Sequence, residues 1–116
     1  VVANVEVINP ATGVVVGHVD NTSVADCLIA VNRAHDAFMT WRRVLPRQRA
    51  EVLRRAYELM MAEQKSLATL IVQENGKVMA DAMAEVAYAA EFFRWFSEEA
   101  VRIDGDLRHA PNGDYW

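Results

Sequence analysis

The segment "AEVAYAAEFFRWFSEEAVRI", residues 84–103, is rich in alanine and glutamate and carries four aromatic rings within the six residues "EFFRWF". Alanine and glutamate favour helix, and two helix-ending signals, Asn75-Gly76 and Gly105, flank the segment. The segment therefore predicts one long helix from about Val78 to Ile103. A domain of 116 residues has a single small core, so four large rings on one turn and a half of helix are more than that core needs.

Two further helices are expected before this one. The first follows the cap cluster Asn21-Thr22-Ser23 and ends near Arg43. The second begins at Pro46, whose fixed φ suits the first turn of a helix, and runs to the stop signal Asn75-Gly76. A break near Gln64 is compatible with the apolar pattern of this second helix.

A β-hairpin is expected at the N-terminus. Two β-branched runs, residues 5–8 and 14–19, are separated by a turn that Asn9-Pro10 starts and Gly13 closes. An isolated two-stranded hairpin is marginal in water, so this one needs a partner surface. The predicted fold is mainly α: a short N-terminal β-hairpin (1–20), then a region of three long helices (21–104) that could bundle together, then a C-terminal loop (105–116), all in one unit of residues 1–116.

Composition excludes several classes of partner. The net charge of −4 and the pI near 5.3 argue against nucleic acid, because phosphate binding requires a basic surface. No apolar run approaches the roughly 20 residues that cross a bilayer, so no membrane partner is expected. A single cysteine, Cys27, cannot form an internal disulfide, which favours a reducing, cytoplasmic location.

The residues do not form a recognisable catalytic set. Cys27 lies on the apolar stripe of the first helix and is expected to be a buried structural residue. The three histidines share no ligand spacing, so no metal site is predicted, and no glycine-rich loop could hold a phosphate, so no cofactor-binding residue is assigned. The three histidines are His18, His35 and His109. The arginines of residues 42–55 are expected to be solvated, and so are four glutamates of the third helix, Glu85, Glu91, Glu98 and Glu99.

The four rings spread around the third helix. At about 100° per residue, with Phe92 at zero, Phe96 falls near 40°, Phe93 near 100° and Trp95 near 300°. One interpretation is that all four rings are core. The other divides the arc between two surfaces. Phe93 and Phe96 then pack inside the domain, whereas Phe92 and Trp95, three residues apart and therefore on one side, face a cavity.

Three stretches together carry a resemblance to a known family. They are "INPATG" (8–13), "AHDAFMTWRRVLPRQRAEVLRRAYELM" (34–60) and "ENGKVMADAMAEVAYAAEFFRWFSEEAVRIDGD" (74–106). In this order they resemble the N-terminal part of the aldehyde dehydrogenase superfamily, and the third is closest to the succinate-semialdehyde dehydrogenase branch. The residues that match the signature of this branch are Glu74, Gly76, Lys77, Glu85, Tyr88, Ala89, Ala90, Phe92, Trp95, Phe96, Glu98, Glu99, Arg102, Ile103, Gly105 and Asp106.

Two departures accompany the resemblance. Val78 stands where the family usually has proline after Gly-Lys, and a hairpin that often precedes this region is missing. Members of the family are about four times longer than this chain. Their nucleophilic cysteine, general-base glutamate and NAD-binding loops lie beyond the position of Trp116, so no catalytic residue is carried over.

The resemblance implies a function for a longer parent enzyme. Such an enzyme oxidises an aldehyde to an acid: a thiolate attacks the carbonyl, hydride passes to NAD or NADP, and water hydrolyses the thioester. Succinate semialdehyde, or a similar acidic aldehyde, is the expected substrate. The chain itself would be a non-catalytic, truncated part of the cofactor-binding domain. Some relatives hold a structural monovalent cation near the equivalents of Ile8 and Glu74, a site that sequence does not reveal here.

The resemblance also assigns the outward-facing rings. The corresponding helix borders the tunnel by which the aldehyde reaches the cysteine, so Phe92 and Trp95 are expected to be substrate-binding residues. The expected partners are the remainder of the dehydrogenase chain and further copies in a homo-oligomer. The alternative from another class is a free-standing helical protein-interaction module without enzymatic activity.

Overall fold

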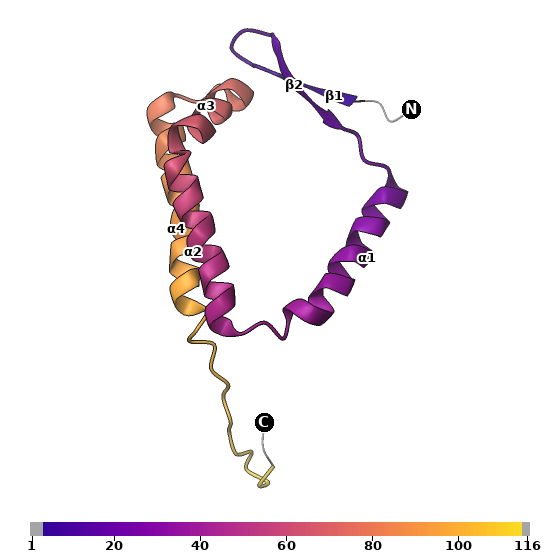
Figure 1. The fold of residues 1–116 in the computed structure, drawn as a ribbon, viewed down its shortest axis with the longest axis vertical. Coiled ribbons are helices and arrows are strands. Elements are labelled where there is room, and N and C mark those ends of the chain that lie inside the picture. Colours follow the sequence, from indigo (N-terminus) through magenta and orange to yellow (C-terminus); the bar gives the residue numbers. More distant parts are fainter. Residues whose placement is uncertain (1–3, 115–116) are drawn as a thin grey trace.

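The computed structural model describes residues 4–114, and the ends of the predicted ranges at 1–3 and 115–116 lie outside this part. The described part is a two-stranded hairpin followed by four helices (Figure 1). The predicted class, mainly α with a short N-terminal β-hairpin, is confirmed. The elements are β1 (Asn4–Ile8), β2 (Val15–Asp20), α1 (Val24–Trp41), α2 (Pro46–Ala62), α3 (Gln64–Asn75) and α4 (Met79–Glu99).

The hairpin forms as the turn residues predicted. β1 and β2 are antiparallel, with Val7 opposite Gly17 and a register irregularity after Val7. The carbonyl of Asn9 accepts the Gly13 N–H at 2.8 Å, and the Asn9 side chain accepts the Ala11 N–H at 2.9 Å. Gly13 has φ 72°, a conformation that glycine adopts without steric cost.

The predicted helix boundaries are confirmed at three positions. The Ser23 hydroxyl caps α1 by accepting the Asp26 N–H at 3.2 Å, and it donates to the Asp26 carboxylate at 2.6 Å. Pro46 is the first residue of α2. Gly76, with φ 77°, ends α3 in the left-handed conformation that closes many helices.

The long second helix of the prediction is two helices in the structure. Glu63, with φ −98° and ψ 14°, leaves the helical conformation and separates α2 from α3, one residue before the expected break near Gln64. The side-chain amide of Gln64 donates to the Met83 carbonyl at 3.0 Å, which ties the start of α3 to α4. The second helix therefore bends around α4 instead of continuing past it.

The last helix is shorter than predicted. α4 ends at Glu99 rather than near Ile103. Beyond this end, the guanidinium of Arg102 donates to the Glu98 carbonyl at 3.3 Å and to the Glu99 carboxylate at 2.9 Å. The first of these bonds satisfies a backbone carbonyl that a further turn of helix would have satisfied.

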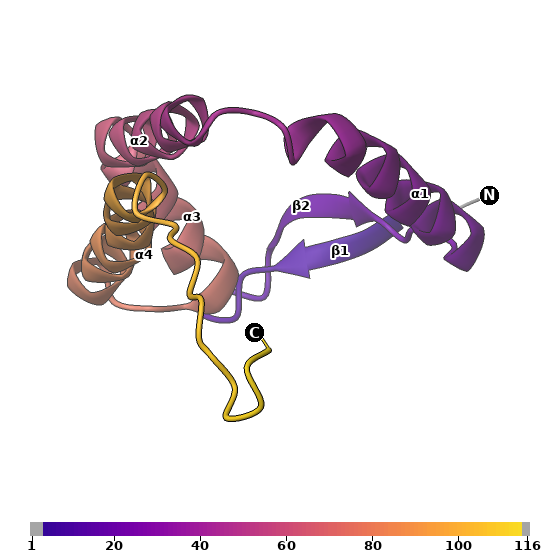
Figure 2. The same cartoon turned by 90° about the horizontal axis from the view of Figure 1, so that it is seen from below.

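Small side chains form the core between α4 and its two neighbours. α2 runs beside α4 along most of the length of α4. α3 packs against the N-terminal part of α4 (Figures 1 and 2). Among residues 4–114, no large side chain is fully buried. Alanine at the contact lets two helix backbones approach closely, so this packing excludes water without large side chains. The buried residues are Ala50, Ala68, Ala82, Val86, Ala90 and Ser97.

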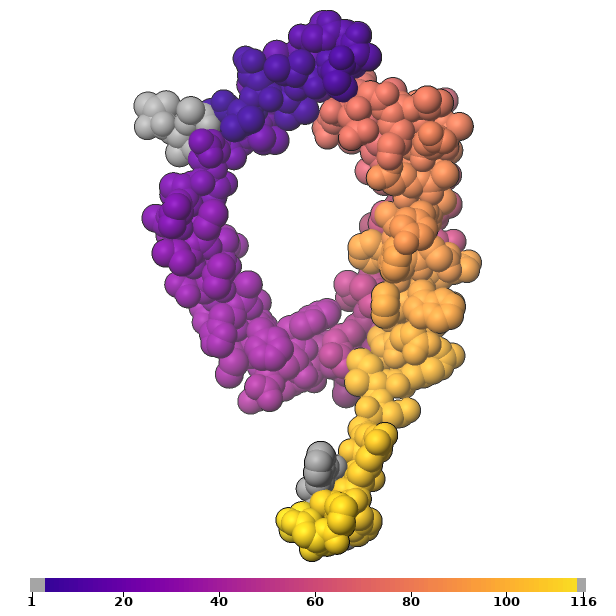
Figure 3. Space-filling model, turned by 180° about the vertical axis from the view of Figure 1, so that it is seen from behind, coloured from indigo at the N-terminus to yellow at the C-terminus, as the bar shows by residue number. Residues whose placement is uncertain are grey.

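α1 does not join this packing. It contributes no buried residue, and the space-filling view shows an opening between α1 and the α2–α4 helices (Figure 3). The expectation of a three-helix bundle is therefore wrong for α1. The expectation that Cys27 is buried is also wrong: its side chain is exposed, because no described element covers the apolar stripe of α1 on which it lies.

The hairpin turn reaches the corner between α3 and α4, so that the hairpin and the helices surround this opening as a closed ring. Figure 2 shows the hairpin reaching from the N-terminal end of α1 to the corner between α3 and α4. At this corner, a methyl group added to Gly76 would lie 3.0 Å from Cγ of Pro10. Proline 10 thus contacts the backbone of Gly76, and this contact supplies part of the partner surface that the hairpin was expected to need.

We expect Gly76→Ala to weaken the structure at this corner. The left-handed conformation costs a non-glycine residue about 1–2 kcal/mol, and the added methyl would displace Pro10. Gly113→Ala is the matched control, because Gly113 has φ 94° with no atom near its added methyl. Amide hydrogen exchange is the measurement: exchange in β1 and β2 should accelerate in Gly76→Ala alone. Equal exchange in both variants would show that the contact does not hold the hairpin.

Candidate functional site

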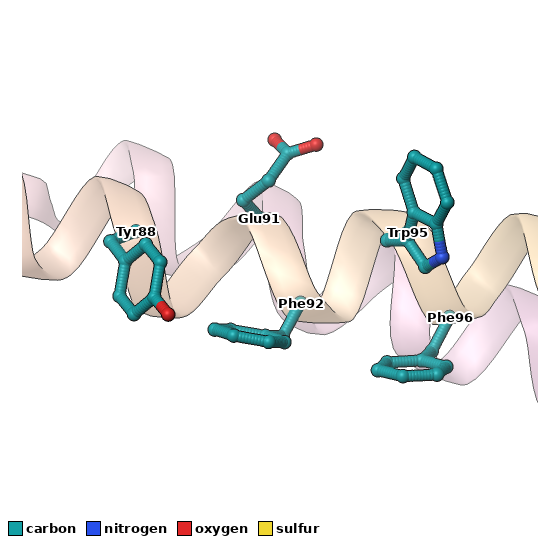
Figure 4. Close-up of a pocket in the computed structure, with 5 residues that line it drawn as sticks. All are labelled: Tyr88, Glu91, Phe92, Trp95 and Phe96. Carbon is teal, nitrogen blue, oxygen red and sulfur yellow. The ribbon is translucent and has the colours of Figure 1, made fainter.

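α4 carries an open aromatic groove on its exposed surface. Its volume is about 290 Å³, and it is lined by Tyr88, Glu91, Phe92, Trp95 and Phe96. Figure 4 shows two rows of side chains. The rings of Tyr88, Phe92 and Phe96 follow one another at four-residue spacing, and Glu91 and Trp95 form a second row beside them.

The rings of the groove are held by local contacts but remain accessible. Tyr88 and Phe92 meet edge to face, with centroids 5.0 Å apart and planes at 85°, a favourable arrangement for aromatic pairs. The exposed fractions are 48% for Phe92, 54% for Phe96 and 58% for Trp95. The groove is therefore an apolar surface open to a ligand or to another part of a protein.

The predicted division of the four rings holds for Phe92 and Trp95, which share one exposed side of α4, whereas neither Phe93 nor Phe96 is buried inside the domain. Phe92 and Trp95 lie together in the groove, and Phe93, 37% exposed, is the least exposed of the four. Phe96 was expected inside the domain but is more exposed than Phe92. The buried residues of α4 centre at about 120° on the wheel that has Phe92 at zero, so Phe93 near 100° faces the core. Phe96, near 40°, lies at the margin of the buried side.

An arginine neutralises the charged side chain of the groove. Arg94 binds the Glu91 carboxylate at 2.8 Å, and its guanidinium lies 5.8 Å from the ring centroid of Tyr57 on α2. The hydrogen bond and the negative charge of Glu91 raise the pKa of Arg94 above its ordinary value. Because Arg94 contacts both helices, it fixes Glu91 at the rim of the groove and leaves the floor apolar.

The groove includes three residues to which sequence analysis gave no site role, Tyr88, Glu91 and Phe96. Tyr88 could have been found, because it precedes Phe92 by four residues and so lies on the same side of the helix. Cys27 and the histidines do not reach this site: Cys27 and His35 are on α1, His18 on β2, and His109 after α4. Within residues 4–114, no group of three or more His, Cys, Asp or Glu could hold a metal ion.

No helix among residues 4–114 is both long and apolar enough to cross a membrane. The candidate site is thus an aromatic surface on a small helical scaffold, with one carboxylate, Glu91, paired to Arg94 at its rim. Such a surface can bind and orient an apolar group and exclude water.

Comparison with known proteins defines the class. The sequence profile described as the aldehyde dehydrogenase family matches residues 2–115. The chain therefore belongs to the aldehyde dehydrogenase family, and the resemblance that the sequence motifs indicated is confirmed.

Within the family, semialdehyde dehydrogenases are similar to this chain. It is 45% identical to glutarate-semialdehyde dehydrogenase of Pseudomonas putida over 110 residues, which cover 93% of this chain and 23% of that protein. It is 41% identical to human mitochondrial succinate-semialdehyde dehydrogenase over 106 residues, 91% of this chain and 20% of that protein. The crystal structure of succinate-semialdehyde dehydrogenase from Burkholderia pseudomallei superposes with a TM-score of 0.89 at 39% identity, covering 94% of this chain and 23% of that one.

The chain thus spans about a fifth to a quarter of the length of these relatives. It corresponds to the N-terminal segment of an aldehyde dehydrogenase, as predicted, and a free-standing interaction module is not favoured. The hairpin and helices described above are this segment's share of the family fold.

Proposed function

We propose that this segment belongs to an NAD(P)-dependent dehydrogenase that oxidises a short acidic semialdehyde, with succinate semialdehyde as the first candidate, to the carboxylic acid. The similarity to succinate- and glutarate-semialdehyde dehydrogenases over nearly the whole chain carries this proposal. The segment's own part is structural. It supplies a scaffold and one wall of the substrate path, and the reacting groups belong to the rest of the enzyme.

The wall is the aromatic groove, and its substrate-binding residues are Phe92 and Trp95. Both rings are about half exposed here and face away from the core of α2–α4. A wall of this kind fits the methylene chain of a semialdehyde and keeps water from the carbonyl, while Arg94 offsets the charge of Glu91 at the rim. Tyr88 extends the same wall by its contact with Phe92.

We assign cofactor binding to the rest of the enzyme. Oxidation of an aldehyde removes a hydride, which an oxidised nicotinamide accepts when bound. A dinucleotide site needs closely spaced glycines so that backbone N–H groups reach the pyrophosphate. This chain's five glycines are scattered and form no such motif, so its residues do not fit the role, and we assign none of them to NAD or NADP.

The partner, the location and the oligomeric state of the enzyme are the remaining assignments. The principal partner is the rest of the dehydrogenase chain, which would cover surfaces that α1 and α4 expose here. We place the enzyme in the cytoplasm because its one cysteine in this segment has no partner for an internal disulfide, and we expect a homo-oligomer.

The 116-residue chain by itself is expected to show no dehydrogenase activity, because its groove holds no thiol nucleophile and its one carboxylate, Glu91, is paired with Arg94. The assay combines the purified chain with succinate semialdehyde or glutarate semialdehyde and with either NAD or NADP, and follows absorbance of the reduced cofactor. A complete enzyme that contains this segment serves as the positive control. Turnover by the short chain that disappears in Cys27→Ala would contradict the assignment of a non-catalytic role.

The substrate proposal is tested on the complete enzyme. A kcat/KM for succinate or glutarate semialdehyde well above that for uncharged aldehydes of the same length would support it. Preference for an uncharged aldehyde would contradict the acidic-substrate assignment and leave the family membership intact.

A further inference from the structure

The aromatic groove contains one carboxylate, that of Glu91, among the five residues that line it. The other side chains of the groove are aromatic rings, which screen a charge far less than water does, so the field of Glu91 extends further along the groove than it would in bulk solvent. The substrate proposed above also carries a carboxylate. An unpaired Glu91 would therefore repel this substrate from the wall that binds it.

Arg94 compensates the charge of Glu91 from outside the groove. Two nitrogens of its guanidinium, Nη2 at 2.8 Å and Nε at 3.1 Å, donate to the same oxygen of Glu91, Oε1. On its other side the guanidinium lies 5.8 Å from the ring centroid of Tyr57 on α2. Arg94 does not itself line the groove, and an arginine in a protein stays protonated. The two side chains therefore form a neutral pair whose position depends on both helices.

A second ion pair at the end of α4 has the same design but lies outside the groove. Arg102 binds the Glu99 carboxylate at 2.9 Å, again three residues apart, with side chains 61% and 43% exposed against 52% and 45% for Arg94 and Glu91. Exposed pairs of this kind contribute little to stability. The Arg94–Glu91 pair differs from it by its place at the groove, so its effect is expected on substrate binding rather than on folding.

We propose that Arg94 is a positioning residue for substrate selection: it holds the Glu91 carboxylate paired at the rim of the groove, so that the aromatic wall admits an anionic semialdehyde. The inference rests on the proposed function, because it requires the substrate to pass this wall. Arg94 acts through Glu91 and makes no contact with the substrate. Without Arg94, the same groove would favour uncharged aldehydes.

The test uses a complete enzyme that contains this segment and carries Arg94→Met, which removes the charge and keeps an unbranched side chain. KM for succinate semialdehyde should rise about three- to tenfold, as expected for one unpaired charge at a partly solvated site. KM for butanal, an uncharged aldehyde of the same chain length, should stay near its native value. kcat should change little for either substrate, because the repulsion acts on the bound substrate and the transition state alike.

Two further variants determine whether charge is the cause. The double variant Glu91→Gln with Arg94→Met has neither charge and should recover a KM for succinate semialdehyde near the native value. Arg94→Lys keeps the cation and should lose little. Added salt should reduce the effect of Arg94→Met, because ions screen the unpaired carboxylate. Loss of a merely structural contact would respond neither to the second substitution nor to salt in this way.

Arg102→Met is the matched control, because it leaves a carboxylate of the same kind unpaired outside the groove. It should leave the ratio of the two KM values unchanged. Urea unfolding of each variant should give a midpoint close to that of the native enzyme, which separates the change in substrate selection from a loss of folded protein.

Two outcomes would overturn the inference while the proposed function stands. One is a native preference for succinate semialdehyde that Arg94→Met leaves unchanged. The other is a double variant as impaired as Arg94→Met, which would mean that Arg94 contacts the substrate carboxylate directly or only supports packing. A native enzyme without preference for the acidic aldehyde would overturn the proposed function, and this inference with it.

Discussion

Ala82→Asp is expected to unfold the packed helices α2–α4. Ala82 has no exposed surface, and its methyl group lies in a cluster with Ala68 and Val86. A carboxylate at this position could not reach water, and burying an unpaired ion costs several kcal/mol. Small domains have a total stability of about 5–15 kcal/mol. A chain whose core is mostly alanine belongs at the lower end of this range, so the loss should remove most of its folded population.

Ala84→Asp is the matched control for this substitution. It makes the same change two residues further along α4, where the side chain is exposed. Both variants lose the same helix propensity, so the difference between them isolates burial. Helical circular dichroism against urea is the measurement. Similar unfolding midpoints for the two variants would mean that the α3–α4 contact does not exclude water at Ala82.

The local elements were predictable because their signals lie in neighbouring residues. Ser23 caps α1 through its own hydroxyl, Pro46 fixes the first turn of α2, and Gly76 supplies the positive φ that ends α3. The hairpin likewise follows from Asn9 and Gly13 in one turn. None of these features depends on a contact distant in the sequence.

The packing was less predictable because its signals are weak or distant. Helices that meet through alanine have no strongly apolar stripe, so Ala68, Ala82 and Ala90 gave no reason to place the core on that side of α4. The apolar stripe of α1 gave the opposite error. Such a stripe usually packs against another element, but no described element covers it here, and so Cys27 is exposed rather than buried.

The candidate site was predicted only in part, because some of its features are local to α4 and others depend on packing. The angles of Phe92 and Trp95 on α4 follow from helix geometry alone, and both rings lie in the groove. The exposure of Phe96 depends on where α2 packs, which the buried residues of α4 decide. The link from Tyr57 through Arg94 to Glu91 joins residues of two helices that are 34 or more positions apart in the sequence, beyond the reach of a local pattern.

In the complete enzyme, Phe92→Ala and Trp95→Ala are expected to change substrate selection far more than stability. Each ring is about half exposed on α4, so its removal leaves the α2–α4 core intact. Loss of an apolar contact with the substrate costs about 1–3 kcal/mol, or 10- to 200-fold in kcat/KM. We expect the loss mainly as a higher KM for the short semialdehyde, with longer aldehydes less affected or improved because the path is wider.

Phe93→Ala is the control that separates substrate binding from packing, because Phe93 is adjacent in sequence, does not line the groove and, at 37%, is the least exposed of the four rings. It should lower the unfolding midpoint while leaving KM of the folded enzyme near its native value. The measurements are steady-state kinetics over a series of aldehyde chain lengths and urea unfolding of each variant. Removal of a core aromatic typically costs about 3–5 kcal/mol. If Phe92→Ala and Trp95→Ala each cost that much, with KM unchanged at every chain length, then both rings are packing residues that the rest of the enzyme buries. The groove would then be no wall of the substrate path.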